Sequence, residues 1–312
     1  QPKAAKIAGV ISVIAEINPM AVRKRFSQGW VEEVIPDQNK LIKRIREARN
    51  KREVISIAYN GNIVDLWECL ADENIRVDIG SDQTSLHNPW AGGYYPAGIS
   101  LEESNRMMSE DPGRFREIVK DSLRRQVRAI NRHCERGTYF FDYGNAFLLE
   151  ASRAGADILK PDGKFRYPSY VEDIMGPVYF DYGFGPFRWV CCSNKEEDLE
   201  KTDRIASETL EGIMKKSPDE IRIQMADNIH WIREAGKNRL VVGSQARILY
   251  ADSEGRTEIA RAFNNAIARS VISAPVSLAG IITMYPALTP HTVKLQISLT
   301  ARCSLPTWLS RM

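Results

Sequence analysis

A polar segment with paired glycines, from Asp82 to Pro96, holds the residue types best suited to bind a ligand. Its amide, hydroxyl, imidazole and phenol groups follow a short apolar run at residues 75–80 that predicts a strand. Gly92 and Gly93 permit positive φ and a close approach of the backbone to a ligand. Because open α/β sheets bind ligands beyond the carboxyl ends of their strands, this segment is a candidate ligand loop. The alternative is an ordinary glycine-rich surface loop.

Two further predicted strands, residues 53–58 and 138–145, also lead into polar turns. In a parallel sheet these strand ends lie on one edge, so the turns could share a ligand site with the first segment. His87 could serve there as a base or as a hydrogen-bond donor, or it could be a structural histidine of the loop.

Glu16 directly follows the apolar run of residues 10–15, which predicts a buried strand. In dinucleotide-binding folds an acid at this place accepts hydrogen bonds from the ribose of the adenosine. The glycine-rich turn that usually accompanies it would lie before Gln1. A plain cap after a strand is the alternative interpretation of Glu16.

Arg188 stands between Phe187 and Trp189 in a segment with glycines at positions 183 and 185, which we expect to form a turn. Arginine binds a carboxylate through two parallel hydrogen bonds, and flanking rings that exclude water strengthen that pair. Arg188 is therefore a candidate partner for an anionic ligand, or else an arginine stacked in a structural turn.

The five cysteines lack Cys-x-x-Cys spacing, which argues against a zinc site or a disulfide scaffold. This usage fits a reducing, cytoplasmic environment, and we expect no bound metal. Cys69, Cys191 and Cys192 have no histidine nearby in the sequence, so inert thiols are favoured over nucleophiles. His133 and His230 occur on charged helical segments and are expected to face solvent.

Strands alternating with helices over the first half of the chain predict an α/β fold with a doubly wound parallel sheet. Residues 100–136 are expected to be helical with a break at Asp111-Pro112, and residues 156–188 to be irregular. The domain boundary is placed near residue 180, so that residues 1–180 form the first domain and 181–280 part of a smaller α/β domain. No apolar run reaches the roughly 18 residues of a membrane span.

The last 32 residues, 281–312, contain three basic residues and no acid. Without them the chain has 43 − 3 = 40 basic residues against 40 acidic ones. The body therefore shows no basic bias toward nucleic acid or a membrane surface.

Several long motifs resemble the urocanase (urocanate hydratase) family. They are residues 77–89, residues 141–145, residues 183–190, residues 241–248 and residues 273–276, and they occur in family order. The resemblance implies a Rossmann-like domain that holds NAD+, which acts as an electrophile toward the imidazole of urocanate while water is added to give imidazolonepropionate. It also implies a homodimer.

The same resemblance carries family roles onto this sequence. It implies that Arg188 pairs with the carboxylate of urocanate and that Glu16 holds the adenosine ribose. The further NAD+ contacts that it implies are Asn62, Ile63, Gln83, Thr84, Ser85, Leu86, His87, Tyr94, Tyr95 and Tyr143.

Departures from the family pattern predict a fragment that is inactive alone. Bacterial relatives carry a cysteine where this chain has Leu249, so no thiol role is assigned. After residues 273–276 the family continues with an Asp-His-His-Asp motif. One possible coding of that motif, read one base later, spells Ile281-Ile282-Thr283-Met284, so residues 281–312 are interpreted as an out-of-frame tail. An NAD-dependent oxidoreductase and a non-catalytic nucleotide-binding remnant remain the alternatives.

Overall fold

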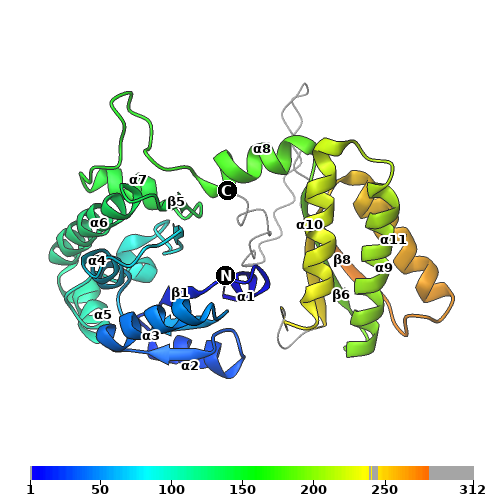
Figure 1. Ribbon diagram of the computed structural model, residues 1–312, viewed down its shortest axis with the longest axis horizontal. Helices are drawn as coiled ribbons and strands as arrows, with labels where there is room; N and C mark the ends of the chain where they lie inside the picture. The colour runs from blue at the N-terminus through cyan, green and yellow to red at the C-terminus, as the bar shows by residue number, and fades with distance from the viewer. Residues whose placement is uncertain (1, 239, 241–244, 281–312) are drawn as a thin grey trace. The chain divides into compact units, whose positions relative to one another are not determined.

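The computed structural model describes residues 2–238, 240 and 245–280. The chain divides into two compact units (Figure 1). The N-unit comprises Ala4–Met175, and the C-unit begins at Gly176. This division falls shortly before residue 180. The predicted out-of-frame tail, residues 281–312, lies outside the described residues.

The strands of the N-unit are all parallel, as the alternating pattern predicts. One sheet has the order β1-β3-β2, and β4 pairs with β5 in a second ladder. The strands are β1 (Ser12–Ala15), β2 (Glu33–Ile35), β3 (Ser56–Tyr59), β4 (Ile79–Asp82) and β5 (Tyr139–Asp142). The strand β4 lies later than the predicted 75–80, because Ile75 packs into the core ahead of the strand.

Helices cover both faces of the central strand β3. Ile57 packs with Leu41 and Ile45 of α3 on one face, whereas Ala58 packs with Val22 of α2 on the other. The helices are α1 (Pro2–Ile7), α2 (Pro19–Ser27), α3 (Gln38–Lys51), α4 (Ile63–Asp72), α5 (Leu101–Glu110), α6 (Pro112–Cys134) and α7 (Phe147–Arg153). Two short π-helical segments, η1 (Pro89–Gly93) and η2 (Tyr170–Met175), complete the N-unit.

Capping side chains mark the residues at which several helices begin. Asn18, Asp37 and Asp111 each accept a hydrogen bond from a backbone N–H in the first turn of the helix that follows. Asp111 also marks the predicted break between α5 and α6. By contrast, α7 was not predicted, since its N-cap residue is Ala146, whose side chain cannot accept a hydrogen bond and whose φ is 67°.

The prediction that His133 faces solvent is wrong. Its side chain is 1% exposed, because the apolar face of α6 that contains it packs against α4. The ring Nε2 lies 3.1 Å from the carbonyl oxygen of Trp67, and burial lowers the pKa of His133. His230 is exposed, as expected.

The C-unit is an antiparallel sheet of order β7-β6-β8 with helices on one face. Trp189 anchors its core, donating from Nε1 to Thr202 at 3.0 Å and meeting the ring of Phe263. Its elements are α8 (Gly176–Val178), η3 (Phe180–Tyr182), β6 (Gly185–Cys191), α9 (Glu196–Met214), α10 (Asp219–Ala235), β7 (Ala246–Ala251), α11 (Ser253–Ala268) and β8 (Val276–Gly280).

The prediction of irregular structure up to residue 188, with Arg188 in a turn, is wrong. Residues 185–191 form the central strand of this sheet. The alternation of buried Phe187, Trp189 and Cys191 with half-buried neighbours is the period-two pattern of a strand. In the ranges that the structure describes, no helix is both long and apolar enough to cross a bilayer.

Candidate functional site

Asparagine side chains join the loops that follow β1, β3 and β4. Asn60 Nδ2 donates to the carbonyl oxygen of Glu16 at 2.9 Å. Asn62 Nδ2 donates to the carbonyl oxygen of Tyr95 at 2.9 Å, while its Oδ1 caps α4 by accepting from Val64 N. The predicted convergence of the turns after β3 and β4 is therefore confirmed, and the Nδ2 and Oδ1 atoms of Asn62 are both already in use.

A buried carboxylate closes each strand of the β4–β5 pair. Asp82 lies opposite Asp142 in the ladder. Asp82 accepts from the backbone N of Thr84 at 2.9 Å and from Nε2 of Gln126 at 2.7 Å. Asp142 accepts from the backbone N of Gly144 at 3.1 Å. Each acid thereby fixes the turn that follows its own strand.

These two acids differ from ordinary surface carboxylates. Burial raises the pKa of Asp82 to about 6, and the hydrogen bonds from Thr84 and Gln126 only partly offset it. Burial also raises the pKa of Asp142. Neither acid was assigned a role from the sequence. A threonine two residues after an acid at a strand end was the available signal for Asp82.

The segment from Asp82 to Pro96 is fastened to α6 on its inner side. The phenol of Tyr94 is 1% exposed and donates to Oε1 of Gln126 at 2.9 Å. The guanidinium of Arg116 lies 5.7 Å from the ring centre of Trp90, within the range of a cation–π contact. The segment is thus an ordered loop with a fixed inner face.

Gly93 closes this loop on itself. The backbone N of Ser85 donates to the carbonyl oxygen of Gly93 at 3.1 Å. A Cβ at Gly93 would lie 2.1 Å from the carbonyl oxygen of Ser85 and 2.3 Å from that of Asn88. Gly92 has a φ of 85°. Gly92 therefore has the positive φ that the sequence allowed, whereas Gly93 is required by a close contact with the loop's own backbone; approach of a ligand to this backbone stays a prediction.

The outer face of the loop presents polar side chains. Gln83, Ser85 and His87 are exposed, and their side chains form no hydrogen bond with the described residues. Their polar groups are available to a ligand. The loop is also tied to the end of β5, because Asn145 Nδ2 donates to the carbonyl oxygen of Gln83 at 3.3 Å.

Other residues that were predicted to contact NAD+ expose less of their side chains. Leu86 and Tyr94 are buried, so a ligand would meet only their backbone. The hydroxyl of Thr84 donates to Asp82. The remaining predicted residues of the loop region are half-buried: Ile63 begins α4, Tyr95 donates to Asn105, and Tyr143 stacks on Tyr170 at 4.9 Å.

Glu16 lies directly after β1 at the same edge of the sheet. Its Oε2 forms an ion pair with Nη1 of Arg25 at 3.0 Å. Its Oε1 accepts from the backbone N of Asn18 at 3.1 Å. The side chain remains 25% exposed, so the carboxylate can accept further hydrogen bonds.

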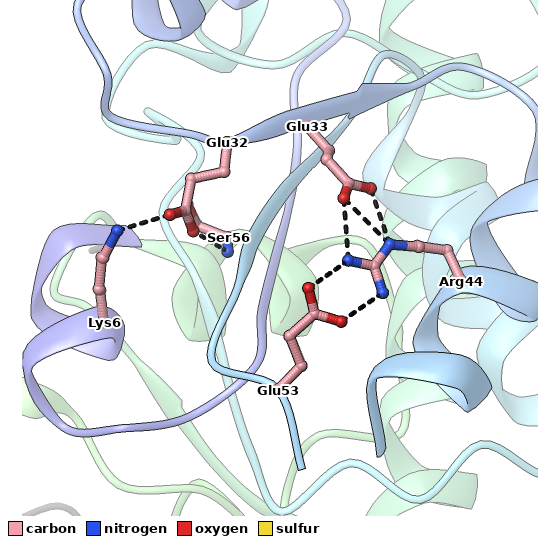
Figure 2. Close-up of polar contacts among 6 residues, drawn as sticks. All are labelled: Lys6, Glu32, Glu33, Arg44, Glu53 and Ser56. Atoms are coloured by element: carbon pink, nitrogen blue, oxygen red, sulfur yellow. Dashed lines mark hydrogen bonds and ion pairs between the residues drawn. The ribbon is translucent and has the colours of Figure 1, made fainter. Parts of the chain in front are cut away.

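A separate charge cluster lies at the opposite edge, where β2 and β3 begin. Figure 2 shows Arg44 of α3 between the carboxylates of Glu33 and Glu53, with N–O distances of 2.8 to 3.0 Å. These hydrogen bonds raise the pKa of Arg44. Beside it, Lys6 reaches Glu32, which accepts from the backbone N of Ser56 (Figure 2). This cluster joins α1 and α3 to the sheet and lies away from the ligand loops.

In the C-unit, Arg188 occupies the middle of β6, opposite Ile248 of β7 and Ala279 of β8. It is half-buried and projects from the sheet face opposite to that of Phe187 and Trp189. Its guanidinium forms no hydrogen bond or ion pair within the described part of the chain.

Both units match domains of one known protein family. Residues 1–174 match the urocanase Rossmann-like domain. Residues 177–280 match the urocanase C-terminal domain. The chain belongs to the urocanase family. The N-unit is thus a Rossmann-like domain, in agreement with its parallel strands and two helical layers.

Proteins named urocanate hydratase or probable urocanate hydratase align with most of this chain. The chain is 56% identical over 282 residues to a probable urocanate hydratase of Dictyostelium discoideum, and 53% identical over 282 residues to one of Caenorhabditis elegans. Each match covers 88% of this chain and 42% of the relative. The urocanate hydratase of Homo sapiens is 53% identical over 287 residues, covering 89% of this chain and 42% of its own. This urocanase-family chain therefore spans less than half the length of these relatives.

Proposed function

We propose that this chain supplies the NAD+-binding loops and part of the substrate site of a urocanate hydratase. That enzyme adds water to urocanate and gives imidazolonepropionate, a step of histidine breakdown. The proposal rests on the relatives named urocanate hydratase and, above all, on one structural observation. The loops after β1, β3, β4 and β5 are joined at one sheet edge and present unused polar groups there.

The residues at this edge fit a dinucleotide. Glu16 offers a half-buried carboxylate after β1, where the ribose hydroxyls of adenosine are bound in Rossmann-like domains. Gly93 leaves no room for a side chain against the backbone of Ser85, so the loop closes on itself and holds its polar side chains in a fixed arrangement. The exposed amide of Gln83, hydroxyl of Ser85 and imidazole of His87 supply donors and acceptors.

Bound NAD+ supplies an electrophilic ring to the imidazole of urocanate. The chain holds and orients it through its own groups. Asn62 and Ile63 would act through the backbone at the start of α4, since the amide of Asn62 is consumed by Tyr95 and Val64. Tyr95 and Tyr143 would contribute half-buried rings that exclude water beside the ligand. Leu86 and Tyr94, whose side chains are buried, would act only through their backbones, whereas the N–H and hydroxyl of Thr84 are already bonded to Asp82.

Arg188 is the proposed partner of the urocanate carboxylate. Its guanidinium has no other anion among the described residues, and two parallel N–H groups match the geometry of a carboxylate. It belongs to the C-unit, whereas the NAD+ loops belong to the N-unit. A homodimer and a cytoplasmic location remain predictions from the resemblance and from the cysteine usage.

Two assays test this function. Calorimetry with NAD+ should show binding to the 312-residue chain. Loss of the ultraviolet absorbance of urocanate reports turnover. We expect no turnover by this chain alone, because it spans only about 42% of the relatives named for the activity. Turnover by the chain alone would contradict this expectation, and reduction of NAD+ by an alcohol would favour an oxidoreductase instead.

A further inference from the structure

The acid after β1 is not alone at its edge of the sheet. Glu16 is paired with Arg25, at 3.0 Å, and the two side chains are 25% and 23% exposed. Arg25 lies in the last turn of α2 and follows two other basic residues, Arg23 and Lys24. Lys24 forms no ion pair with the described residues, so within this basic run it is Arg25 that pairs with Glu16.

The pairing of Glu16 with Arg25 bears on which dinucleotide binds, because the adenosine ribose has a free 2′-hydroxyl in NAD+ and a 2′-phosphate in NADP+. An acid at this place accepts hydrogen bonds from a free 2′-hydroxyl and repels a 2′-phosphate. A nearby arginine does the reverse, because its guanidinium forms charge-assisted hydrogen bonds with phosphate oxygens. Here both groups are present, and the guanidinium is occupied by the acid.

We propose that Glu16 and Arg25 form the pair that selects NAD+ over NADP+. Arg25 holds the carboxylate of Glu16 in position for the 2′-hydroxyl. When the charge of Glu16 is removed, Arg25 becomes free to bind a 2′-phosphate. This inference rests on the proposed NAD+ function and adds to it a basis for cofactor specificity.

The backbone supports a fixed position for the pair. Glu16 is held from three directions: its N donates to the carbonyl oxygen of Tyr59, its carbonyl accepts from Asn60, and its Oε1 accepts from the N of Asn18. The carboxylate therefore cannot turn away from Arg25 without breaking the contact with Asn18. A neutral amide of the same shape can keep the contact with Asn18 while releasing the guanidinium from its ion pair.

The test compares calorimetric affinities of the full chain for NAD+ and NADP+. The wild type should prefer NAD+. Glu16→Gln should raise the affinity for NADP+ by about tenfold or more, because a charged hydrogen bond to phosphate is added. The preference for NAD+ should thereby narrow or reverse. Adding Arg25→Met to Glu16→Gln should remove the gain.

The matched control is Glu32→Gln. It removes one carboxylate from the same sheet at the opposite edge, where Glu32 is paired with Lys6 (Figure 2). It should leave the preference unchanged, which excludes a general effect of net charge. Thermal unfolding of each variant checks that the fold is intact. The part-exposed Glu16–Arg25 pair should contribute little to the stability of the fold.

The outcomes distinguish failure of the specificity pair from failure of the proposed NAD+ function. NAD+ binding by the wild type without a gain in NADP+ affinity in Glu16→Gln overturns the specificity pair and leaves the proposed function standing. An equal gain in Glu16→Gln with and without Arg25→Met also overturns it. Absence of binding of both dinucleotides by the wild type and by Glu16→Gln overturns both claims.

Discussion

Individual carboxylates of this chain are held in two different ways. Asp82 is buried against neutral donors only, Thr84 and Gln126, and burial raises its pKa to about 6. Asp203 of the C-unit is ion-paired with Arg247 at 2.9 Å, yet burial outweighs the arginine and raises the pKa of Asp203 to about 7. In both acids, burial therefore disfavours the charged form.

The substitution Asp82→Asn should change how stability depends on pH. The folded chain holds the proton of Asp82 more tightly than the unfolded chain, whose ordinary value is 3.8. This residue therefore stabilises the fold below pH 3.8, and that contribution is lost as the pH rises through about 6. The two values correspond to about 3 kcal/mol, an upper estimate.

Urea unfolding of the wild type and of Asp82→Asn, at about pH 4 and about pH 7.5, measures this difference. The wild type should lose more stability than the variant as the pH rises. Asp121→Asn is the control, because Asp121 is largely exposed and its pair with Arg124 lies on the surface. Equal pH dependence in the wild type and Asp82→Asn would contradict the assignment.

The loop after β4 is fixed by contacts along its inner face and by a hydrogen bond that closes it. Its inner face is bonded to α6 through Gln126 and Arg116, and its two ends meet where Ser85 donates to Gly93. The loop is thus prepared before any ligand arrives, which reduces the ordering cost of binding.

The substitution Gly93→Ala should disturb this loop. The added Cβ would collide with the carbonyl oxygens of Ser85 and Asn88, and neither backbone can move without breaking the loop. We expect a loss of about 2–3 kcal/mol in the free energy of unfolding and weaker NAD+ binding. Gly113→Ala is the control: the nearest atom to its Cβ would be Asp111 Oδ1 at 3.7 Å, in a helix that favours alanine. Equal stability of the two variants would refute the role given to Gly93.

Local signals and long-range contacts explain what the sequence could and could not predict. Strands followed by polar turns, and the break at Asp111-Pro112, are local patterns, so the parallel sheet and the pair of helices α5 and α6 were predicted. The strand β6 was missed because Gly183, Gly185 and Pro186 suggested a turn. The bond between Asp82 and Gln126 joins residues 44 positions apart, and no local pattern announces it. The burial of His133 has the same cause, since only the packing of α4 on α6 decides it.

At the scale of the whole molecule, the N-unit separates structural charges from ligand-facing ones. The cluster of Arg44 with Glu33 and Glu53 lies where β2 and β3 begin, whereas Glu16 and the asparagine contacts lie where the strands end. The two edges can therefore be altered independently.

The substitution Arg44→Met tests this separation. It leaves two carboxylates facing each other without their shared cation, so the melting temperature should fall. NAD+ affinity, measured below that temperature, should stay within about twofold of the wild type, since additivity holds for distant sites. A large loss of affinity in a variant that is still folded would show that the two edges are coupled.

Calorimetric titration of the 312-residue chain with NAD+ tests whether the strand-end loops of the N-unit bind the dinucleotide. We expect saturable binding of NAD+ to the folded wild type, weakened by Gly93→Ala and retained by Arg44→Met. Absence of binding by a chain whose folding is verified by circular dichroism would contradict the assignment of these strand-end loops as an NAD+ site.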